Sequence, residues 1–400
     1  MIKELTIENT SLPEGWCSEK LDTLCDVEYG TRVVRKRDGG TIYPVYGGGG
    51  ATFFMDTFNR EDCLVVARFA MSEKCTRFVN GKFFLNDSGL SVKPKDTDIV
   101  SQEFLNKYFI FLNDYIYSLA RGTAQKNLNV PAFRKIEILY PESLTKQKQI
   151  VATLDKAFAA IDTAKANAGQ NLENAKELFE SYLQNIFENK GDDWEEKKLS
   201  KVTSKIGSGA TPRGGKSSYK EEGISLIRSM NVHDFYFKKK NLAFIDDKQA
   251  NALSNVTLQE KDILLNITGA SIARCCMIPK EYLPARVNQH VSIIRAKKDI
   301  INPVFLASLL TSKYFKDQIL EIGEQGATRQ AITKVQLENF RISYPKEIEE
   351  QKKVVQNINL IKAETKKLET IYTQKLADLE EMKKSILQKA FSGELTNKTV

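Results

Sequence analysis

Residues 137–151 read EILYPESLTKQKQIV, and residues 341–355 repeat the outline as RISYPKEIEEQKKVV. The constant offset of 204 residues extends without a gap from Gly122–Phe187 to Gly326–Phe391. Self-similarity at a fixed offset marks a duplicated unit, so the chain is predicted to be a tandem duplication rather than a solenoid. Matched positions include Ile138/Ile342, Tyr140/Tyr344, Pro141/Pro345, Gln147/Gln351, Lys148/Lys352 and Leu183/Leu387.

A long proline-free stretch follows Pro141 and Pro345, after a short predicted strand at Arg134–Tyr140 or Phe340–Tyr344. In each stretch apolar residues recur at spacings of three, four and seven, the period of a helix with one apolar stripe. Each helix would hold about 46 residues and reach roughly 70 Å. The stripe comprises Ile150, Leu154, Phe158, Ile161, Leu172, Ala175, Phe179, Leu183 and Ile186, and then Val354, Ile358, Ile361, Leu368, Tyr372, Leu379, Met382 and Ile386.

A stripe of that length needs an equally long partner, and the other copy supplies one. Because a folded domain separates the copies, we expect an antiparallel helix pair. Packing of each helix on its own domain alone is the alternative. Asp162–Asn171 is polar and contains Gly169, so either a locally weak continuous helix or a kink is expected there. The predicted helix-pair and partner interface is Ile150, Leu154, Phe158, Phe179, Leu183, Phe187, Val354, Ile358, Leu368, Leu379, Leu387 and Phe391.

The globular parts are duplicated as well. Trp16 with Leu21 recurs as Trp194 with Leu199, and Asp62 recurs as Asp262. The predicted fold is α+β, with two mixed α/β domains in tandem. We expect domains at 1–141 and 191–345, long helices at 142–190 and 346–400, and a loose arm at Met1–Ser11. Expected strands are Tyr43–Tyr46, Leu64–Ala67, Phe83–Leu85, Ile224–Arg228, Ile263–Ile267 and Val291–Arg295, and expected helices are Phe104–Leu119 and Pro303–Leu320.

Composition narrows the class of protein. The net charge is +8, which suits an acidic partner such as nucleic acid without requiring one. The six cysteines lack regular spacing, and neither a signal peptide nor a long apolar run is present. These features predict a cytoplasmic protein with reduced thiols and no membrane span.

Motifs for catalysis or cofactor binding are missing. A phosphate loop would need glycine at Ala210, with four residues between it and Gly215-Lys216-Ser217, so an ATP site there is disfavoured. The only histidines are His233 and His290, which leaves little for a metal site or a catalytic triad. We therefore expect no catalytic residues, no metal and no cofactor in this chain.

Basic and polar residues gather in glycine-rich loops of unequal length. Lys and Arg there would contact phosphates, and Asn, Gln, Arg, Ser and Thr would read base edges. For each residue, an ordinary solvated or structural role is an equal alternative. The candidates are Arg32, Arg35, Lys36, Arg37, Tyr46, Gly47, Gly48, Arg68, Lys126, Thr211, Arg213, Lys216, Arg228, Asn231, Lys238, Lys239, Thr268, Ser271, Arg274, Asn288, Gln289, His290 and Arg329, with the loops Gly122–Asn127 and Gly326–Gln330.

The whole chain resembles the specificity subunits of type I restriction–modification enzymes. The resemblance is carried by Tyr140-Pro141 leading to Gln147-Lys148-Gln149-Ile150-Val151, by Tyr344-Pro345 leading to Gln351-Lys352-Lys353-Val354-Val355, by Ser385–Leu395, by Tyr43–Gly48 and by Val287–His290. It implies two target recognition domains, each reading one half of a split double-stranded DNA site, joined by antiparallel helices that set the spacer.

The resemblance also implies partners. Two methyltransferase subunits would dock on the helices and bind S-adenosylmethionine, and restriction subunits would bring ATP- and Mg²⁺-dependent translocation and cleavage. This chain would then be a non-catalytic recognition subunit. The alternatives are a specificity subunit served by one fused modification–restriction partner, a methyltransferase or nuclease acting alone, and a coiled-coil scaffold without a role on DNA.

Overall fold

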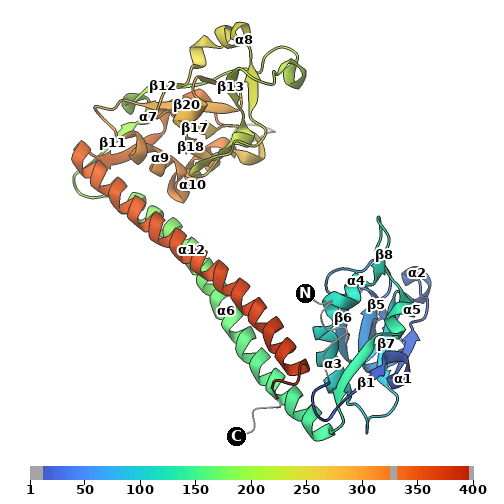
Figure 1. Cartoon of the computed structure of the whole chain (residues 1–400). Coiled ribbons are helices and arrows are strands. Elements are labelled where there is room, and N and C mark those ends of the chain that lie inside the picture. Colours follow the sequence, from blue (N-terminus) through green and yellow to red (C-terminus); the bar gives the residue numbers. More distant parts are fainter. Residues whose placement is uncertain (1–11, 325–330, 396–400) are drawn as a thin grey trace. The chain divides into compact units, whose positions relative to one another are not determined.

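The computed structural model describes residues 12–324 and 331–395. The expected arm Met1–Ser11, the candidate Arg329 and the loop Gly326–Gln330 therefore lie outside the described residues. The chain forms two compact units, Met1–Gly169 with Gln374–Val400, and Gln170–Thr373 (Figure 1). Each unit holds one α+β domain together with half of each long helix.

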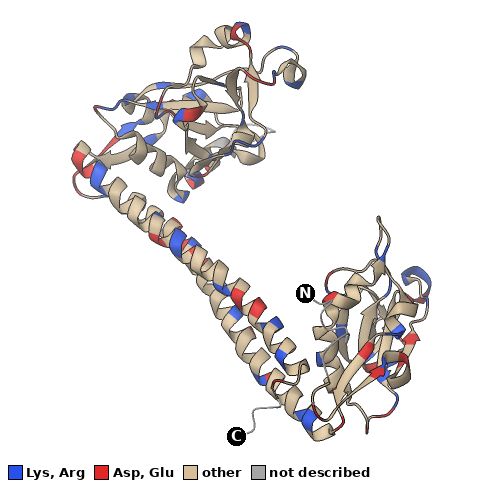
Figure 2. Ribbon diagram, in the orientation of Figure 1, with Lys and Arg blue, Asp and Glu red and all other residues tan. Residues whose placement is uncertain are grey.

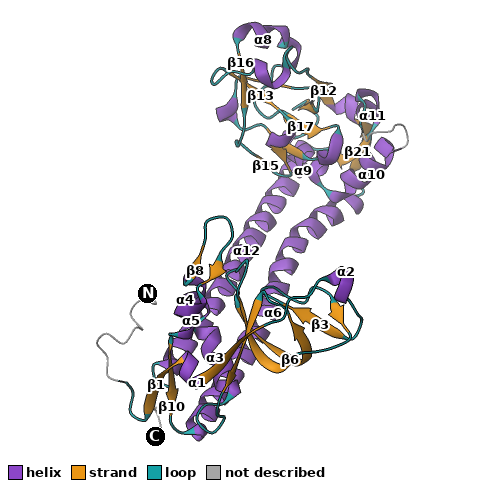
Figure 3. Cartoon of the chain, turned by 90° about the vertical axis from the view of Figure 1, so that its right-hand side faces the viewer, coloured by secondary structure: helices purple, strands orange, loops and turns teal. Residues whose placement is uncertain are grey.

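The two long helices are α6 (Leu144–Glu188) and α12 (Ile348–Phe391), which lie side by side in both views (Figures 1 and 3). Lys165 pairs with Glu380 at 2.5 Å and Asp162 with Lys383 at 3.8 Å. Three steps back along α6 are thus three steps forward along α12, which makes the pair antiparallel. Of the two alternatives for Asp162–Asn171, the continuous helix is the one observed.

Most of the predicted stripe faces inward. Ile150, Leu154, Phe158, Leu183, Phe187, Ile358, Leu379, Leu387 and Phe391 are buried, whereas Phe179, Val354 and Leu368 are half-buried. The placement of Met382 in the stripe is wrong, since 51% of its surface is exposed. It lies three residues past Leu379, a spacing that periodicity alone accepts on either edge of the stripe.

The first domain contains one mixed six-stranded sheet. Its order is β2 (Cys25–Tyr29), β7 (Gly89–Pro94), β5 (Arg60–Ala67), β6 (Thr76–Leu85), β3 (Tyr43–Tyr46) and β4 (Phe54–Met55). Strands β3 and β6 run parallel, and the other pairs are antiparallel. Around it lie α1 (Leu21–Leu24), α2 (Arg35–Asp38), α3 (Gln102–Phe111), α4 (Asn113–Ser118), α5 (Val130–Arg134), β1 (Trp16–Lys20) paired with β10 (Glu137–Pro141), and the hairpin β8 (Ala120–Arg121) and β9 (Asn127–Leu128).

The second domain has the same strands in two sheets. One has the order β12 (Thr203–Ser208), β20 (Val291–Ala296), β17 (Ile263–Asn266), β18 (Cys275–Met277), and the other β16 (Ala243–Ile245), β13 (Ile224–Ile227), β19 (Ala285–Val287). The single strand β6 is thus replaced by β18 and β19. Further elements are β11 (Trp194–Lys198) paired with β21 (Arg341–Pro345), the hairpin β14 (Val232–His233) and β15 (Tyr236–Phe237), α7 (Leu199–Val202), α8 (Asp247–Ala252), α9 (Pro303–Thr311), α10 (Lys313–Glu324) and α11 (Lys334–Asn339).

The structure corrects three element predictions. The helix expected at Phe104–Leu119 is divided into α3 and α4, and the one at Pro303–Leu320 into α9 and α10. The second break occurs at Ser312, whose backbone is extended and whose hydroxyl accepts the Phe315 amide. Arg134 belongs to α5, so the strand before Pro141 begins only at Glu137.

In both domains the start of a long helix is fixed to the core by the same three hydrogen bonds. The buried amide of Gln147 donates to Ile99 O and Pro141 O, each at 2.9 Å, and accepts from Ser101 N at 2.9 Å. In the other unit Gln351 makes the equivalent bonds to Ile300 O, Pro345 O and Asn302 N. Both glutamines are fully buried. This shared clamp explains why the repeated sequence keeps a polar residue where a helix meets a core.

Each core also contains the last residues of the second long helix, α12 in the first domain and α6 in the second. Phe391 of α12 lies against Tyr108, with ring centroids 4.9 Å apart, in the core of the first domain. Phe187 of α6 lies 5.6 Å from Phe305 in the core of the second. Each domain therefore rests on the beginning of one long helix and the end of the other.

Candidate nucleic-acid interface

An asparagine turn occurs at the same place in both domains. Asn86 N donates to Tyr46 O at 2.8 Å, and its side-chain oxygen accepts the Ser88 amide at 2.9 Å. In the second domain Asn288 N donates to Ile227 O at 3.0 Å, and its side-chain oxygen accepts the His290 amide at 3.0 Å. Each asparagine thus shapes its own turn, as such side chains commonly do.

Each turn also accepts a backbone hydrogen bond from a residue that follows a neighbouring strand. Arg68 N donates to Ser88 O at 2.8 Å, and Ile267 N donates to His290 O at 3.0 Å. In both domains a glycine also packs closely against a backbone carbonyl at the turn. A Cβ on Gly30 would lie 2.0 Å from Asn86 O, and one on Gly209 would lie 1.8 Å from Val287 O. Only glycine permits this close backbone approach.

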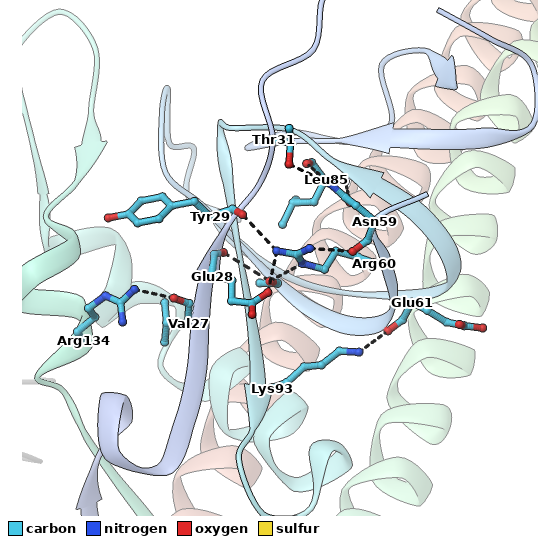
Figure 4. A network of polar contacts seen from close by, with 11 residues as sticks. Val27, Glu28, Tyr29, Thr31, Asn59, Arg60, Glu61, Leu85, Lys93 and Arg134 are labelled. Carbon is cyan, nitrogen blue, oxygen red and sulfur yellow. Dashed lines mark hydrogen bonds and ion pairs between the residues drawn. The ribbon is translucent and has the colours of Figure 1, made fainter. Parts of the chain in front are cut away.

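A polar network anchors the first turn to the sheet (Figure 4). Arg60 donates to Ser91 Oγ at 2.8 Å and Tyr29 O at 3.2 Å, and pairs with Glu28 at 2.9 Å. Asn59 accepts the Leu85 amide at 2.7 Å, one residue before the turn. A pocket of about 260 Å³ opens beside Arg60. The network holds the end of β2 against β5 and β7, so that the loop after Tyr29 starts from a fixed position.

Arg68 presents a stacked guanidinium next to the first turn. Its guanidinium carbon lies 4.2 Å from the Phe69 ring centroid and 4.8 Å from that of Tyr29, and Nη1 donates to Asp87 O at 3.1 Å. The side chain remains half-buried. Tyr46, another candidate, packs edge-on against Phe83 at 5.5 Å.

The glycine loop after Tyr46 is less free than its composition suggests. Side chains at Gly47 and Gly48 would collide with Ser88 Oγ and Phe69 O, so these two glycines serve packing, whereas Gly49 and Gly50 face open space. Arg77 donates to Gly48 O at 3.0 Å and also to Gly49 O. The sequence carried no signal for Arg77, because its partners are 28 and 29 residues away.

Helix α2 forms an exposed basic segment (Figure 2). Arg35 and Lys36 have no ion-pair partner among the residues that the structure describes, whereas Arg37 pairs with Asp38 at 2.8 Å. The hydrogen bond from Arg37 lowers the pKa of Asp38 below its usual value. Arg32 is also exposed, and Lys126 lies over the Tyr117 ring at 4.3 Å in the β8–β9 hairpin.

In the second domain a chain of side-chain hydrogen bonds crosses the turn. Thr211 Oγ1 donates to Gln289 Oε1 at 2.5 Å, and Gln289 Nε2 lies 3.1 Å from His290 Nε2. His290 Nδ1 lies 2.6 Å from Thr268 Oγ1. A neutral imidazole protonated on Nδ1 satisfies all three contacts, since Gln289 then donates to Nε2. Gln289 is exposed, while Asn288 beneath it is buried.

Some predicted DNA contacts are structural instead. Asn231 is fully buried, and its amide is used by Lys238 O and Arg228 N, so the prediction that it contacts DNA is withdrawn. Arg228 packs on Tyr219 and donates to Asn241 O. Ser271 is half-buried and accepts from Asn266. The exposed candidates are Arg213, Lys216, Lys238 and Lys239, and Arg274 is half-buried.

Asp87 was not among the predicted residues. It is the equivalent of Gln289, because each follows the turn asparagine directly. Likewise Ser88 corresponds to His290. One backbone framework therefore carries an acid and a hydroxyl in the first domain and an amide and an imidazole in the second. A structural alignment of the two turns would have been needed to find this pair.

The described residues also bear on metal-binding, membrane-spanning and nucleotide-binding functions. Within residues 12–324 and 331–395, no three His, Cys, Asp or Glu side chains converge into a metal-binding group. In that same part of the chain, none of the helices combines the length and apolarity needed to cross a membrane. The segment resembling a phosphate loop enters a 3₁₀ turn at Gly215–Ser218 rather than an α-helix.

Known proteins share this duplicated architecture. A family model described as type I restriction modification DNA specificity domain matches residues 13–174 and again residues 191–380. The chain belongs to the type I restriction–modification specificity subunits. Subunits of this family recognise DNA and are non-catalytic. Each of the two matches covers one domain and most of the helix after it.

Curated relatives agree with the family. The EcoBI specificity subunit of Escherichia coli is 24% identical over 330 residues, covering 74% of this chain and 67% of that protein. The MjaVIII specificity subunit of Methanocaldococcus jannaschii is 25% identical over 344 residues, covering 80% of this chain and 77% of that protein.

Two solved structures share the fold. A chain from a structure concerning complex assembly and conformational transition of the type I R-M system has a TM-score of 0.76 at 18% identity, and covers 96% of this specificity subunit and 100% of that chain. The HsdS subunit of Thermoanaerobacter tengcongensis has a TM-score of 0.61 at 18% identity, with coverages of 98% and 100%.

Proposed function

We propose that each domain of this specificity subunit reads one half of a bipartite double-stranded DNA site through its asparagine turn. One observation carries the proposal. The turns at Asn86 and Asn288 share their backbone hydrogen bonds but present different side chains next to the asparagine. A common frame with unlike side chains is what two independent readers of different sequences require.

The side chains around the turns fall into two groups, one suited to phosphate contacts and the other to base contacts. The exposed residues of α2 supply charge for phosphates, which position a protein without reading sequence. Gln289 offers an amide that can pair with adenine through two hydrogen bonds, while Asp87 offers an acceptor for the cytosine amino group. Arg68, half-buried between two aromatic rings, is a preorganised donor for a guanine or a phosphate.

The long helices serve as the spacer and as the docking element in this proposal. The recognition domains are 1–141 and 191–345, and the helical segments 142–190 and 346–400. Two methyltransferase subunits dock on the helices and carry S-adenosylmethionine, and restriction subunits supply ATP- and Mg²⁺-dependent translocation, all in the cytoplasm. A fused modification–restriction partner would use the same surfaces.

A methylome tests the proposal. The chain is expressed with its cognate methyltransferase subunit in a host without DNA methylation, and N6-methyladenine is mapped by sequencing. We expect a split motif with two short halves, one fixed gap and one modified adenine in each half. Methylation at a single undivided motif would overturn the two-reader proposal. Exchanging residues 191–345 for those of another member should change one half only.

Binding of the isolated chain to DNA gives a second test. Neutralising one phosphate-contacting cation lowers the slope of log affinity against log salt by about one unit. We expect Lys36→Ala to do so equally on any sequence, because α2 contributes charge alone. The matched control is Lys148→Ala, an exposed residue on α6 far along the chain from either turn. An unchanged slope for Lys36→Ala would remove α2 from the interface.

A further inference from the structure

The apolar seam between the two long helices does not by itself dictate which helix pairs with which. Seam positions that are identical in the two copies include Leu172/Leu376, Leu183/Leu387 and Phe187/Phe391. A second chain could therefore offer α6 to α6, or α12 to α12, with the same apolar residues. We call these the homotypic pairs, and the observed pair of α6 with α12 the heterotypic pair.

The charged residues beside the seam differ between the two copies. In the first unit Lys165 of α6 pairs with Glu380 of α12 at 2.5 Å. At the offset of 204 residues Lys165 corresponds to Glu369, and Glu380 corresponds to Lys176. In the second unit the pKa of Lys176 is raised by a hydrogen bond to Glu173 and also by the charge of Glu369. In both units, therefore, α6 supplies the lysine and α12 the glutamate.

A second pair of positions follows the same rule. In the first unit Lys383 of α12 lies over the Phe158 ring of α6 at 4.5 Å. The corresponding positions in the second unit hold Phe179 on α6 and Lys362 on α12. There the Phe235 ring contacts both, with its centroid 5.2 Å from that of Phe179 and 4.9 Å from the Lys362 ammonium. An aromatic ring on α6 and a cation on α12 are thus brought together in both units, which is an attractive arrangement.

Homotypic pairing in the same register would bring like charges together. Because one offset relates the two units, a pair of α6 helices would place Lys165 opposite Lys176. A pair of α12 helices would place Glu369 opposite Glu380. Each of these contacts would occur twice, since an antiparallel pair of identical helices has twofold symmetry. Like charges that face each other across a helix pair oppose its formation.

The pair of α12 helices is disfavoured further. In it Lys383 would face Lys362 and Lys366 of the other copy. In the heterotypic pair Lys383 has the Phe158 ring and the Asp162 carboxylate at 3.8 Å instead. Because every α6 pair formed by exchange leaves an α12 pair behind, repulsion in either one opposes the exchange.

We propose that these charges select the heterotypic pair, so that one molecule carries one of each recognition domain. A surface ion pair contributes little to stability by itself. Selection depends instead on the difference between attraction in one pairing and repulsion in the other, which is how charges beside a coiled-coil seam set partner choice. The inference concerns the helix pair and goes beyond the proposed function, because it stands whether or not the domains read DNA.

Exchange between the two halves of the chain measures this selection. A protease site inserted between Lys190 and Gly191, in the exposed segment between α6 and β11, allows the folded full chain to be cut once. The helix pair holds the halves 1–190 and 191–400 together, and they are then exchanged between molecules in dilute urea. Native mass spectrometry counts the heterotypic pair and both homotypic pairs, and the counts give an exchange constant.

Two variants separate the charge pattern from the individual charges. Lys176→Glu with Glu369→Lys reverses one facing pair, so that both homotypic pairs now join opposite charges. Adding Lys165→Glu and Glu380→Lys reverses both facing pairs and restores like charges in each homotypic pair. Both variants keep the heterotypic contacts attractive, so the two-pair variant is the matched control for the one-pair variant.

The one-pair variant is expected to raise the exchange constant at least about tenfold, since the two contacts in each homotypic pair change from repulsive to attractive. The two-pair variant should match the wild type. Raising the salt concentration to about 1 M should screen the repulsion and raise the exchange constant of the wild-type chain. Circular dichroism of the uncut chains checks that both variants are folded.

Three results overturn the inference. The first is an exchange constant of the one-pair variant that is no higher than that of the wild type. The second is a rise in the two-pair variant as large as in the one-pair variant, which would assign the effect to the substitutions themselves. The third is the absence of homotypic pairs from all three proteins even in about 1 M salt, because shape rather than charge would then select the partner.

Discussion

Replacing Gln351 by methionine removes the clamp between α12 and the second domain. Methionine matches the length and volume of glutamine but cannot hydrogen-bond strongly. Three backbone groups then lose their partner, namely Ile300 O at 3.1 Å, Pro345 O at 2.8 Å and Asn302 N at 2.7 Å. A buried polar group left unsatisfied costs about 1 kcal/mol or more, so the variant should lose about 3 kcal/mol.

Calorimetry and hydrogen exchange together measure this loss. In a unit of this size, about 3 kcal/mol lowers Tm by about 6–12 °C. The Asn302 amide should also exchange faster, because its acceptor is gone. Gln356→Met changes the same residue type at an exposed position of the same helix and should leave both readouts unaltered.

The same change in the other unit is an internal replicate. Gln147 makes the equivalent three bonds and is equally buried, so Gln147→Met should shift the unfolding of the first unit by a similar amount. A Gln351→Met variant that melts within 2 °C or so of the wild type, with Asn302 still protected, would refute the reasoning.

Four further outcomes are expected. Gln289→Ala should relax base preference at one position of one half-site by about 1–3 kcal/mol in the methylome, and leave the other half unchanged. Leu387→Asp buries a charge in the first core and should unfold that unit in denaturant titrations, whereas Met382→Asp, at an exposed position five residues away, should not. At pH 8 a thiol reagent should label Cys17 first, since the other cysteines are buried. Burial raises the pKa of Cys25 from 9.0 to about 12, so its contribution to stability is present below pH 9 and is lost as pH rises toward 12.

Several parts of the architecture followed from the residues alone. The fixed offset of 204 residues predicted the duplication, and the spacing of apolar residues predicted two long helices. Their antiparallel pairing followed from the folded domain that separates the two copies. Periodicity succeeds here because helix formation and a helical stripe depend on residues three or four positions apart. It failed at Met382, because the same spacing describes both edges of a stripe.

Residue type alone separated the candidates on the asparagine turns from the buried ones only in part. Residue type pointed to Gln289 and His290, and both lie on the turn at Asn288, where Gln289 accepts a hydrogen bond from Thr211, another candidate. Residue type also pointed to Asn231, which is fully buried, and to Gly47, which packs against Ser88. An asparagine or glycine in a loop has the same letter whether it faces DNA or the core, so composition could not separate the two.

The sequence by itself determined that this protein is a duplication of one recognition domain and one long helix, because those features are local or recur at one offset. Only the tertiary structure decided which side chains meet. Thr211 and Gln289 are 78 residues apart in the sequence, and Gln351 lies 51 residues from Ile300, whose carbonyl accepts its hydrogen bond. Such contacts depend on how sheets and helices pack, and no periodicity in the chain encodes the packing of residues that distant. The turns at Asn86 and Asn288 are likewise recognised as equivalent only in the folded chain. Their hydrogen bonds match, although loops of unequal length separate the strands in the sequence.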